Sequence, residues 1–432
     1  MQEDPGRQMM TGSFHPIDEG EWACQAYLGA VEKLFRAVVE GDMETVRDIV
    51  EGGFDLQRRD HVGRTALHLA ILSKTETISS YLIDSGARIT ARLVDGRTSL
   101  HLASQLGMKN TVSKLLERSK QNEKKAEEEK AAAEKKDRDE DTGMDGGDSH
   151  GGDDTNPSSD DDWDSDGEPR KTKPITAPTT TVNDPPAEGA AIPEDNEELP
   201  DVLDINAVDW DFMYSPLSHA IIAGHVQVVD ILVRAGADVT TPFKKGASWA
   251  QVTVYPLTLT LLTEDTKSAC AIAERLLEGG ASCTAADDCL KTIFHQAVLA
   301  KATELVKTFI RVDPNAKAAM DILSYLSWNE VANPLVSAIS LNHPAMAALL
   351  ISSGSSPKIT PEMYDRSWEA RHSIGSKNSY IPRKQDNQWL VDTVFPVEAA
   401  LARQSDLVIP MIQLGADLNL GLRASHQYNS GG

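Results

Sequence analysis

The sequence predicts an all-α solenoid, a stack of helix-turn-helix units that is interrupted by one disordered acidic insertion. Three observations carry this prediction. A six-residue segment returns after 33 positions, Leu and Ala are plentiful while aromatic residues make up only 5% of the chain, and glycines stand where second helices should end. A unit of this size cannot bury its own apolar face, so neighbouring units must stack to form a common core.

The repeat is clearest near the amino terminus. Residues 65–70, Thr-Ala-Leu-His-Leu-Ala, return as residues 98–103, Thr-Ser-Leu-His-Leu-Ala, and Gly63 and Gly96 keep the same interval. Residues 34–37 open an earlier unit, again 33 residues before. This opening and this period resemble the ankyrin-repeat family, whose unit is a β-turn followed by two antiparallel helices. The resemblance implies a preformed surface for binding other proteins.

Further openings follow downstream. The fullest match spans residues 215–239, which begin Ser-Pro-Leu-Ser-His-Ala and close Gly-Ala-Asp-Val. Weaker openings begin at Tyr255, Thr292, Asn333 and Phe395, which gives about eight units with the last four degenerate. Ser or Thr before the first helix caps it, and Pro suits its first position. Glycines end the second helices where a left-handed residue is wanted, and they are Gly52, Gly53, Gly86, Gly236, Gly279, Gly280, Gly354 and Gly415.

We therefore expect four regions along the chain. Residues 21–119 hold repeats 1–3, and residues 120–200 form an insertion. Residues 201–420 hold repeats 4–8, with an inserted loop near 361–394, and residues 421–432 form a flexible tail. No polar capping repeat is visible before the chain stops, so the sequence also allows a longer protein.

The insertion begins with residues 123–131, a Glu- and Lys-rich run that suits a solvated helix without an apolar face. As a whole it is predicted to be disordered because it is charged, poor in apolar residues and rich in Pro and Thr. From Asp137 to Glu168 the sequence contains fourteen acidic residues and one Arg, which gives a net charge of -13. This tract is either a solvated spacer, a ligand for basic proteins such as histones with Trp163 as an anchor, or a segment that folds back on the repeats. Three serines each stand three residues before an acid and resemble acidophilic-kinase sites, namely Ser158, Ser159 and Ser165.

Charge and composition exclude several classes of protein. The net charge of -24 argues against direct nucleic-acid binding and against docking on anionic membranes. Four cysteines in 432 residues are too few for a disulfide scaffold, and neither a signal peptide nor an apolar stretch of about 20 residues is visible. We expect an intracellular protein, cytoplasmic or nuclear or both.

Arginines recur in register and give the candidate binding residues. Arg59 and Arg92 lie 33 residues apart, as do Arg64 and Arg97. In the family that the sequence resembles, these phases fall on the turns, or fingers, that contact partners. Together with His61 and Asp95, these four arginines form the expected contact set, and Val62 and Val94 lie beside them in the sequence. A basic stripe would suit an acidic partner, and the alternative is that these arginines serve solubility.

Catalysis has no visible apparatus. His68, His101 and His295 resemble the structural histidine of the repeat, which hydrogen-bonds across neighbouring turns. Cys283 and Cys289 lack the spacing of a zinc site, and no phosphate-binding loop or nucleophile motif is present. We expect no enzyme activity and no cofactor.

The predicted function is a scaffold or adaptor that binds other proteins. Two alternatives stay open. One is the recruiting arm of a larger enzyme whose catalytic domain lies beyond Gly432. The other is a nuclear role in which the acidic tract binds histones or other basic proteins.

Overall fold

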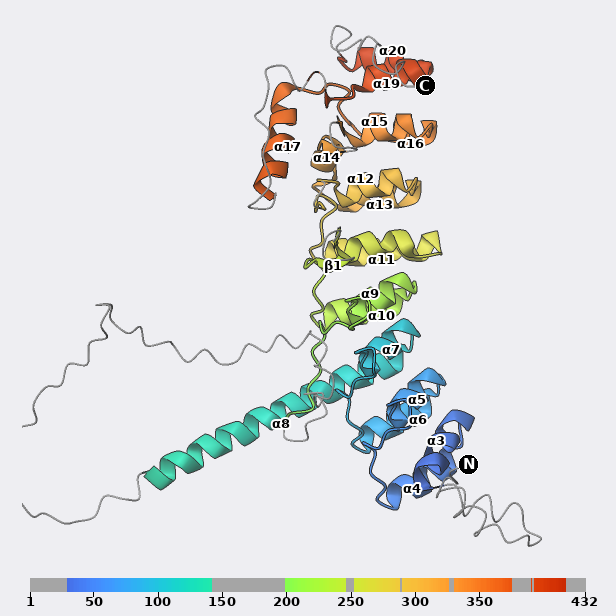
Figure 1. Ribbon diagram of the computed structural model, residues 1–432, viewed down its shortest axis with the longest axis vertical. Coiled ribbons are helices and arrows are strands. Elements are labelled where there is room, and N and C mark those ends of the chain that lie inside the picture. The colour runs from blue at the N-terminus through green and yellow to red at the C-terminus, as the bar shows by residue number, and fades with distance from the viewer. Residues whose placement is uncertain are drawn as a thin grey trace, which may run out of the picture.

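The computed structural model describes residues 29–141, 199–245, 252–287, 290–325, 330–374, 390 and 392–416. The described residues form a column of stacked helix pairs, from α3 at one end to α20 at the other (Figure 1). The predicted phosphorylation sites Ser158, Ser159 and Ser165, together with the rest of residues 142–198 and the predicted tail, lie outside the described residues.

The first helix pairs lie before the acidic tract. The bounds are α3 (Ala30–Glu40), α4 (Met43–Glu51), α5 (Ala66–Leu72), α6 (Glu76–Asp84), α7 (Ser99–Gln105) and α8 (Lys109–Asp141), and in the second and third pairs the second helix is the longer one. The helices α5 and α7 begin at the predicted caps Thr65 and Thr98. Thr65 accepts a hydrogen bond from the N–H of His68, three residues into the helix.

The later helices continue the column and carry more elaboration. In chain order they are α9 (Pro216–Ile222), α10 (Val226–Arg234), η2 (Pro256–Leu262, a 3₁₀ helix), α11 (Thr266–Glu278), α12 (Ile293–Leu299), α13 (Thr303–Val312), α14 (Ala316–Met320), α15 (Pro334–Ser340), α16 (Pro344–Ser352), α17 (Pro361–Ile374), α19 (Pro396–Arg403), η3 (Ser405–Leu407) and α20 (Val408–Gln413). Two antiparallel ribbons are inserted among them, β1 (Phe243–Lys245) with β2 (Val252–Val254) and β3 (Ser324–Tyr325) with β4 (Val331–Ala332).

Two turns of the unit take a residue with positive φ, which explains the spacing of the glycines. After the first helix, this residue is Gly41, Lys74, Gly107, Gly224, Lys301 or Asn342. After the second helix it is Gly53, Gly86, Gly236, Gly280, Gly354 or Gly415. The predicted helix-ending role of the second set is confirmed.

The third unit departs from the predicted boundary at residue 119. In register with Gly53 and Gly86 stands Ser119, and α8 continues past it to Asp141. A residue that is not glycine does not favour the left-handed turn, and the Lys, Glu and Ala residues that follow are strong helix formers. The predicted disordered insertion therefore begins as helix.

The units on either side of the insertion stack directly on one another. The Nε2 atom of His101 donates to the carbonyl of Ala207 at 3.0 Å. The N–H of Leu203 donates to the hydroxyl of Ser119 at 2.8 Å, so the returning chain binds where the long helix replaced a turn. The units that precede and follow residues 142–198 are therefore neighbours in one column.

A single apolar cluster runs through the stacked helices, from Leu34 in α3 to Met411 in α20. A second, smaller cluster lies under α17, where an inserted loop was predicted. Tyr364 of α17 is 1% exposed and packs there with Leu290 and Leu323. The hydroxyl of Ser367 donates to the carbonyl of Leu323 at 3.0 Å, which fixes α17 against the turns that precede α12 and β3.

Candidate partner-binding surface

Each unit meets the next through a turn that projects before the first helix, which we call a finger. The first described fingers are residues 59–64, 92–97 and 209–214, which precede α5, α7 and α9. Isolated bridges close two of them, between Arg59 and Thr65 and between Arg92 and Thr98.

Arg59 and Arg92 tie neighbouring fingers together from inside. Arg92 is only 2% exposed, and its Nη1 atom donates to the carbonyls of Gly96 at 2.7 Å and Val208 at 3.0 Å. Arg59 is half-buried and donates in the same way to the carbonyls of Gly63 and Arg92. The prediction that Arg92 is an exposed contact residue is wrong, because its guanidinium satisfies backbone carbonyls that the turns leave unpaired.

Arg64 and Arg97 reach the surface but already have carboxylate partners. The Nε atom of Arg64 lies 2.7 Å from a carboxylate oxygen of Asp60, and Arg97 lies 2.6 Å from Asp95. Burial would raise the pKa of both carboxyl groups, but hydrogen bonds from the arginines and their charge lower it below its usual range. The predicted residue Asp95 is therefore the ion-pair partner of Arg97, and both arginine charges are largely compensated. His61 is exposed, as expected.

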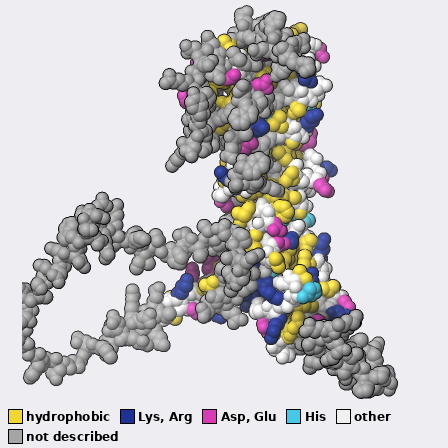
Figure 2. Space-filling view, viewed as in Figure 1, with side chains coloured by type: hydrophobic (Ala, Val, Ile, Leu, Met, Phe, Trp, Pro, Cys, Tyr) yellow, Lys and Arg dark blue, Asp and Glu magenta, His cyan; other side chains and the backbone are white. Residues whose placement is uncertain are grey.

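The tips of the fingers carry exposed apolar side chains. Val62 is 49% exposed, Val94 is 78% exposed and Phe212 is 52% exposed, with Met213 beside it at 37%. Figure 2 shows hydrophobic side chains next to Lys and Arg side chains along the visible face of the column. We name the exposed and half-buried finger residues the finger surface, and it comprises His61, Val62, Arg64, Val94, Asp95, Arg97, Phe212 and Met213.

Sequence reasoning missed Phe212 and Met213 because the third finger has lost its arginine. Asp209 stands six residues before the cap Ser215, where Arg92 stands before Thr98. Its carboxylate accepts from the N–H of Phe212 at 2.7 Å and lies 2.7 Å from Nε2 of His219. Aligning the capping residues, rather than the arginines, would have found this finger.

Close approach between fingers depends on Gly96. The ring of Trp210 lies over it, and a Cβ atom there would come within 2.6 Å of the ring. The backbone N–H of Trp210 donates to the backbone carbonyl of Asp95 at 2.9 Å, and the guanidinium of Arg92 lies 5.7 Å from the centroid of the Trp210 ring. These contacts hold the second and third fingers side by side across the insertion.

The three predicted histidines are structural, as expected. His68 accepts at Nδ1 from the N–H of Thr65 and donates from Nε2 to the carbonyl of Ala91 at 3.2 Å in the next finger. Burial, with the charge of Arg59, lowers the pKa of His68 to about 4. Burial, with His219 and Arg92, lowers that of His101 to about 3. His295 is likewise buried and hydrogen-bonded to Ser337 of the next unit, so burial keeps all three histidines neutral where they join neighbouring units.

Among the described residues, no group of three His, Cys, Asp or Glu side chains is placed to hold a metal ion. None of the described helices combines the length and the apolar character that crossing a bilayer needs. Cys283 is fully buried, and burial together with Asp313 raises the pKa of its thiol far above the usual range, so it is an unreactive core residue.

Stacked helix pairs with projecting fingers define a binding solenoid of the repeat class. Residues 34–126 match the family model for ankyrin repeats in three copies, and residues 213–242 match the model for a single ankyrin repeat. The chain is an ankyrin-repeat protein. The units outside the matched stretches have ankyrin-like helix pairs, and the number of repeats stays a prediction.

Curated relatives share short stretches with this chain. Diacylglycerol kinase zeta of Rattus norvegicus is 31% identical over 88 residues, which is 20% of this chain and 10% of the kinase. Protein phosphatase 1 regulatory subunit 27 of Homo sapiens is 40% identical over 63 residues, which is 15% of this chain and 41% of that subunit. The chain thus spans less than half the length of either relative.

Solved ankyrin domains align over more of the chain at low identity. The ankyrin repeat domain of Bcl-3 covers 71% of this chain and 92% of its own length, with 18% identity and a TM-score of 0.41. An ankyrin repeat domain from Acinetobacter baumannii covers 65% and 96%, with 15% identity and a TM-score of 0.40.

Proposed function

We propose that this chain is a non-catalytic scaffold that holds a protein partner on the finger surface. Ankyrin repeats in general mediate binding between proteins, and the match to a phosphatase regulatory subunit agrees with such a role. The observation that carries the proposal is a row of exposed apolar tips on fingers that are tied to one another through their backbone.

Rigid fingers favour binding because little conformational entropy is lost when a partner docks. Arg59 and Arg92 join successive fingers, so the tips keep their spacing before any partner arrives. Apolar side chains exposed to water gain free energy when a partner covers them, at roughly 25 cal/mol per Å². Val94, which is 78% exposed, is the side chain with most to gain.

The partner that fits this surface presents apolar groups flanked by charges of both signs. Arg64 and Arg97 each keep a carboxylate within 2.7 Å, so the finger surface is less basic than the arginine stripe predicted from the sequence. Rim ion pairs of this kind set register and association rate more than affinity. We therefore propose that burial of Val62, Val94 and Phe212 contributes most of the free energy of binding.

Affinity capture with variant chains as baits tests the proposal. Val94→Asp with Phe212→Asp should abolish capture of partners, and Arg64→Glu with Arg97→Glu should weaken it. The matched controls are Ile409→Asp, an equally exposed apolar residue of α20, and Arg234→Glu with Arg311→Glu, paired arginines on second helices. Partners that survive the finger variants but are lost with the controls would refute the finger surface.

A bait lacking residues 142–198 separates the finger surface from the acidic tract. If capture follows the fingers, this bait keeps its partners. If every partner disappears with the tract, the solenoid is only a carrier and the proposal fails.

A further inference from the structure

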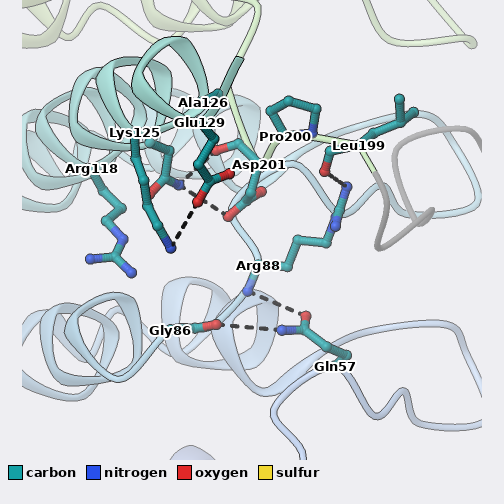
Figure 3. Close-up of a pocket in the computed structure, with 11 residues that line it drawn as sticks. Gln57, Gly86, Arg88, Arg118, Lys125, Ala126, Glu129, Leu199, Pro200 and Asp201 are labelled. Carbon is teal, nitrogen blue, oxygen red and sulfur yellow. Dashed lines mark hydrogen bonds and ion pairs between the residues drawn. The ribbon is translucent and has the colours of Figure 1, made fainter. Parts of the chain in front are cut away.

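The extension of α8 creates a pocket that shares no lining residue with the finger surface (Figure 3). The pocket has a volume of about 390 Å³ and lies between α8, the turn after α6 and the chain that returns at Leu199. It exists because Ser119 does not end its helix where Gly53 and Gly86 end theirs.

One polar stripe of α8 forms a wall of this pocket. Arg118, Asn122, Lys125 and Glu129 are spaced at i, i+4, i+7 and i+11, so they lie on one face of the helix. In Figure 3 the side chains of Arg118 and Lys125 both point from α8 into the space between the helix and the turn at Gly86. Helix geometry places their Cα atoms about 10 Å apart along the axis, within the joint reach of two long side chains.

Both carboxylates that line the pocket already have hydrogen-bond or ion-pair partners. Asp201 accepts from the N–H groups of Ile89 and Thr90 and from the hydroxyl of Thr90, at 2.8 to 3.1 Å. Glu129 lies 3.8 Å from Lys125 on the exposed side of the stripe. Neither carboxylate forms an ion pair with Arg118.

Arg118 is the unusual member of the group. It is half-buried like Arg64 and Arg97, yet within the described part of the chain it forms no hydrogen bond or ion pair, whereas those two arginines each hold a carboxylate. A guanidinium that is partly removed from water without a partner is unfavourable, and an incoming anion would supply the missing acceptors. Arg88 lines the opposite wall and donates to the hydroxyl of Thr90 and the carbonyl of Leu199. The pocket therefore has three cationic side chains and two carboxylates, one of which pairs with Lys125.

We propose that this pocket binds an oxyanion, a phosphate or a carboxylate, that is presented by an acidic peptide segment. Arg118 is the principal ligand because its planar guanidinium can donate two parallel hydrogen bonds to either group. Lys125 adds a second charge from the same stripe, and Arg88 closes the site from the turn. The pocket is partly open to solvent, so one side chain of the peptide enters it while the peptide backbone stays outside.

Fluorescence anisotropy with the purified full chain tests this site. The probe is a fluorescein-labelled pentapeptide with one phosphoserine among aspartates, and its unphosphorylated form and inorganic phosphate serve as comparison ligands. Arg118→Gln with Lys125→Gln should weaken binding of the probe by about tenfold or more, since each lost charge-assisted hydrogen bond reduces affinity. Lys120→Gln with Lys124→Gln, exposed residues outside the lining set on the same helix, should change it less than about twofold.

Each outcome decides the proposal. Preference for the phosphorylated probe assigns the pocket to phosphate, equal binding of both peptides assigns it to carboxylates, and displacement by inorganic phosphate shows that the anion alone suffices. Equal weakening in the two double variants, or no binding of any probe, would overturn it, because diffuse charge on α8 would then explain the result. The melting temperature should change little in the pocket variant, because Arg118 forms no hydrogen bond or ion pair with the described residues and the exposed pair of Lys125 with Glu129 contributes little.

Discussion

Buried histidines of the first helices reach the next unit through backbone carbonyls at His68 and His101, but through side-chain hydroxyls at His295. His68 and His101 donate to the carbonyls of Ala91 and Ala207. His295 holds the same position in its helix but lies between two hydroxyls, at 2.8 Å from Ser324 and 2.7 Å from Ser337. The comparison shows that stacking needs a buried bridging group at this place and tolerates different partners for it.

The turns before the first helices also differ in what covers them. Val62 and Val94 are exposed, whereas Leu290, in the turn before α12, is only 9% exposed and packs in one cluster with Tyr364 of α17. The inserted helix α17 therefore covers part of this later turn.

The largest expected effect comes from removing a bridging histidine. His101→Ala and His295→Ala should each lower the free energy of unfolding by about 3 kcal/mol, because buried acceptors or hydroxyls on both sides lose their partner and a cavity remains. Urea unfolding measures this, with the exposed His61→Ala as a control expected within about 0.5 kcal/mol of the natural chain. A small effect at His295 alone would mean that the side-chain ties of the second half are dispensable.

A smaller loss is expected at the glycine between the second and third fingers. Gly96→Ala should lower stability by about 2 to 3 kcal/mol, because the residue has φ of 81° and its Cβ would meet the ring of Trp210. Gly63→Ala has the same backbone strain but only an ordinary contact with Val94, so about 1 kcal/mol is expected. Thermal unfolding of the pair checks this, and equal losses would show that the contact with Trp210 contributes nothing.

The internal and external arginines should separate stability from binding. Arg92→Gln should lower the free energy of unfolding by about 2 kcal/mol, because carbonyls of two fingers lose a charged donor. Arg97→Gln should cost less than about 0.5 kcal/mol, since a surface ion pair contributes little. Urea titration measures both free energies of unfolding, and capture of a partner by the two variants measures the effect on binding. A larger loss of stability in Arg97→Gln than in Arg92→Gln would contradict the structural role of Arg92.

Acid should weaken the stack through its neutral histidines. His68 has a folded pKa of about 4, and His101 and His295 of about 3, all below the unfolded value near 6.5. The unfolded chain binds more protons below pH 6.5, so stability is lost as the pH falls from 6.5 towards the folded values, by at most about 1.4 kcal/mol per pH unit for each histidine. Urea midpoints between pH 6.5 and 5 measure this slope. His295→Asn should reduce the slope by about a third, and an unchanged slope would exclude His295 as a contributor.

The repeat could be predicted because its signals are local. Caps such as Thr65, left-handed glycines and the 33-residue period act within one turn or one helix, so the sequence shows them directly. The elaborations were harder, because β3, β4 and α17 form by packing on one another in the second apolar cluster and not by a repeated pattern. The extension of α8 could be predicted from Ser119 and the helix-forming residues after it, but only when Ser119 is aligned with the helix-ending glycines of the other units.

The sequence by itself determined the class of fold, the caps, the helix ends and the structural histidines, since each follows from near neighbours in the chain. Only the tertiary structure decided which arginines are buried and which reach the surface. Arg59, Arg64, Arg92 and Arg97 share a repeated pattern, yet Arg92 is buried because Val208 and Trp210 cover it after returning from beyond the insertion. The burial of Arg92 depends on residues more than a hundred positions away, and a local sequence pattern does not show where those residues pack.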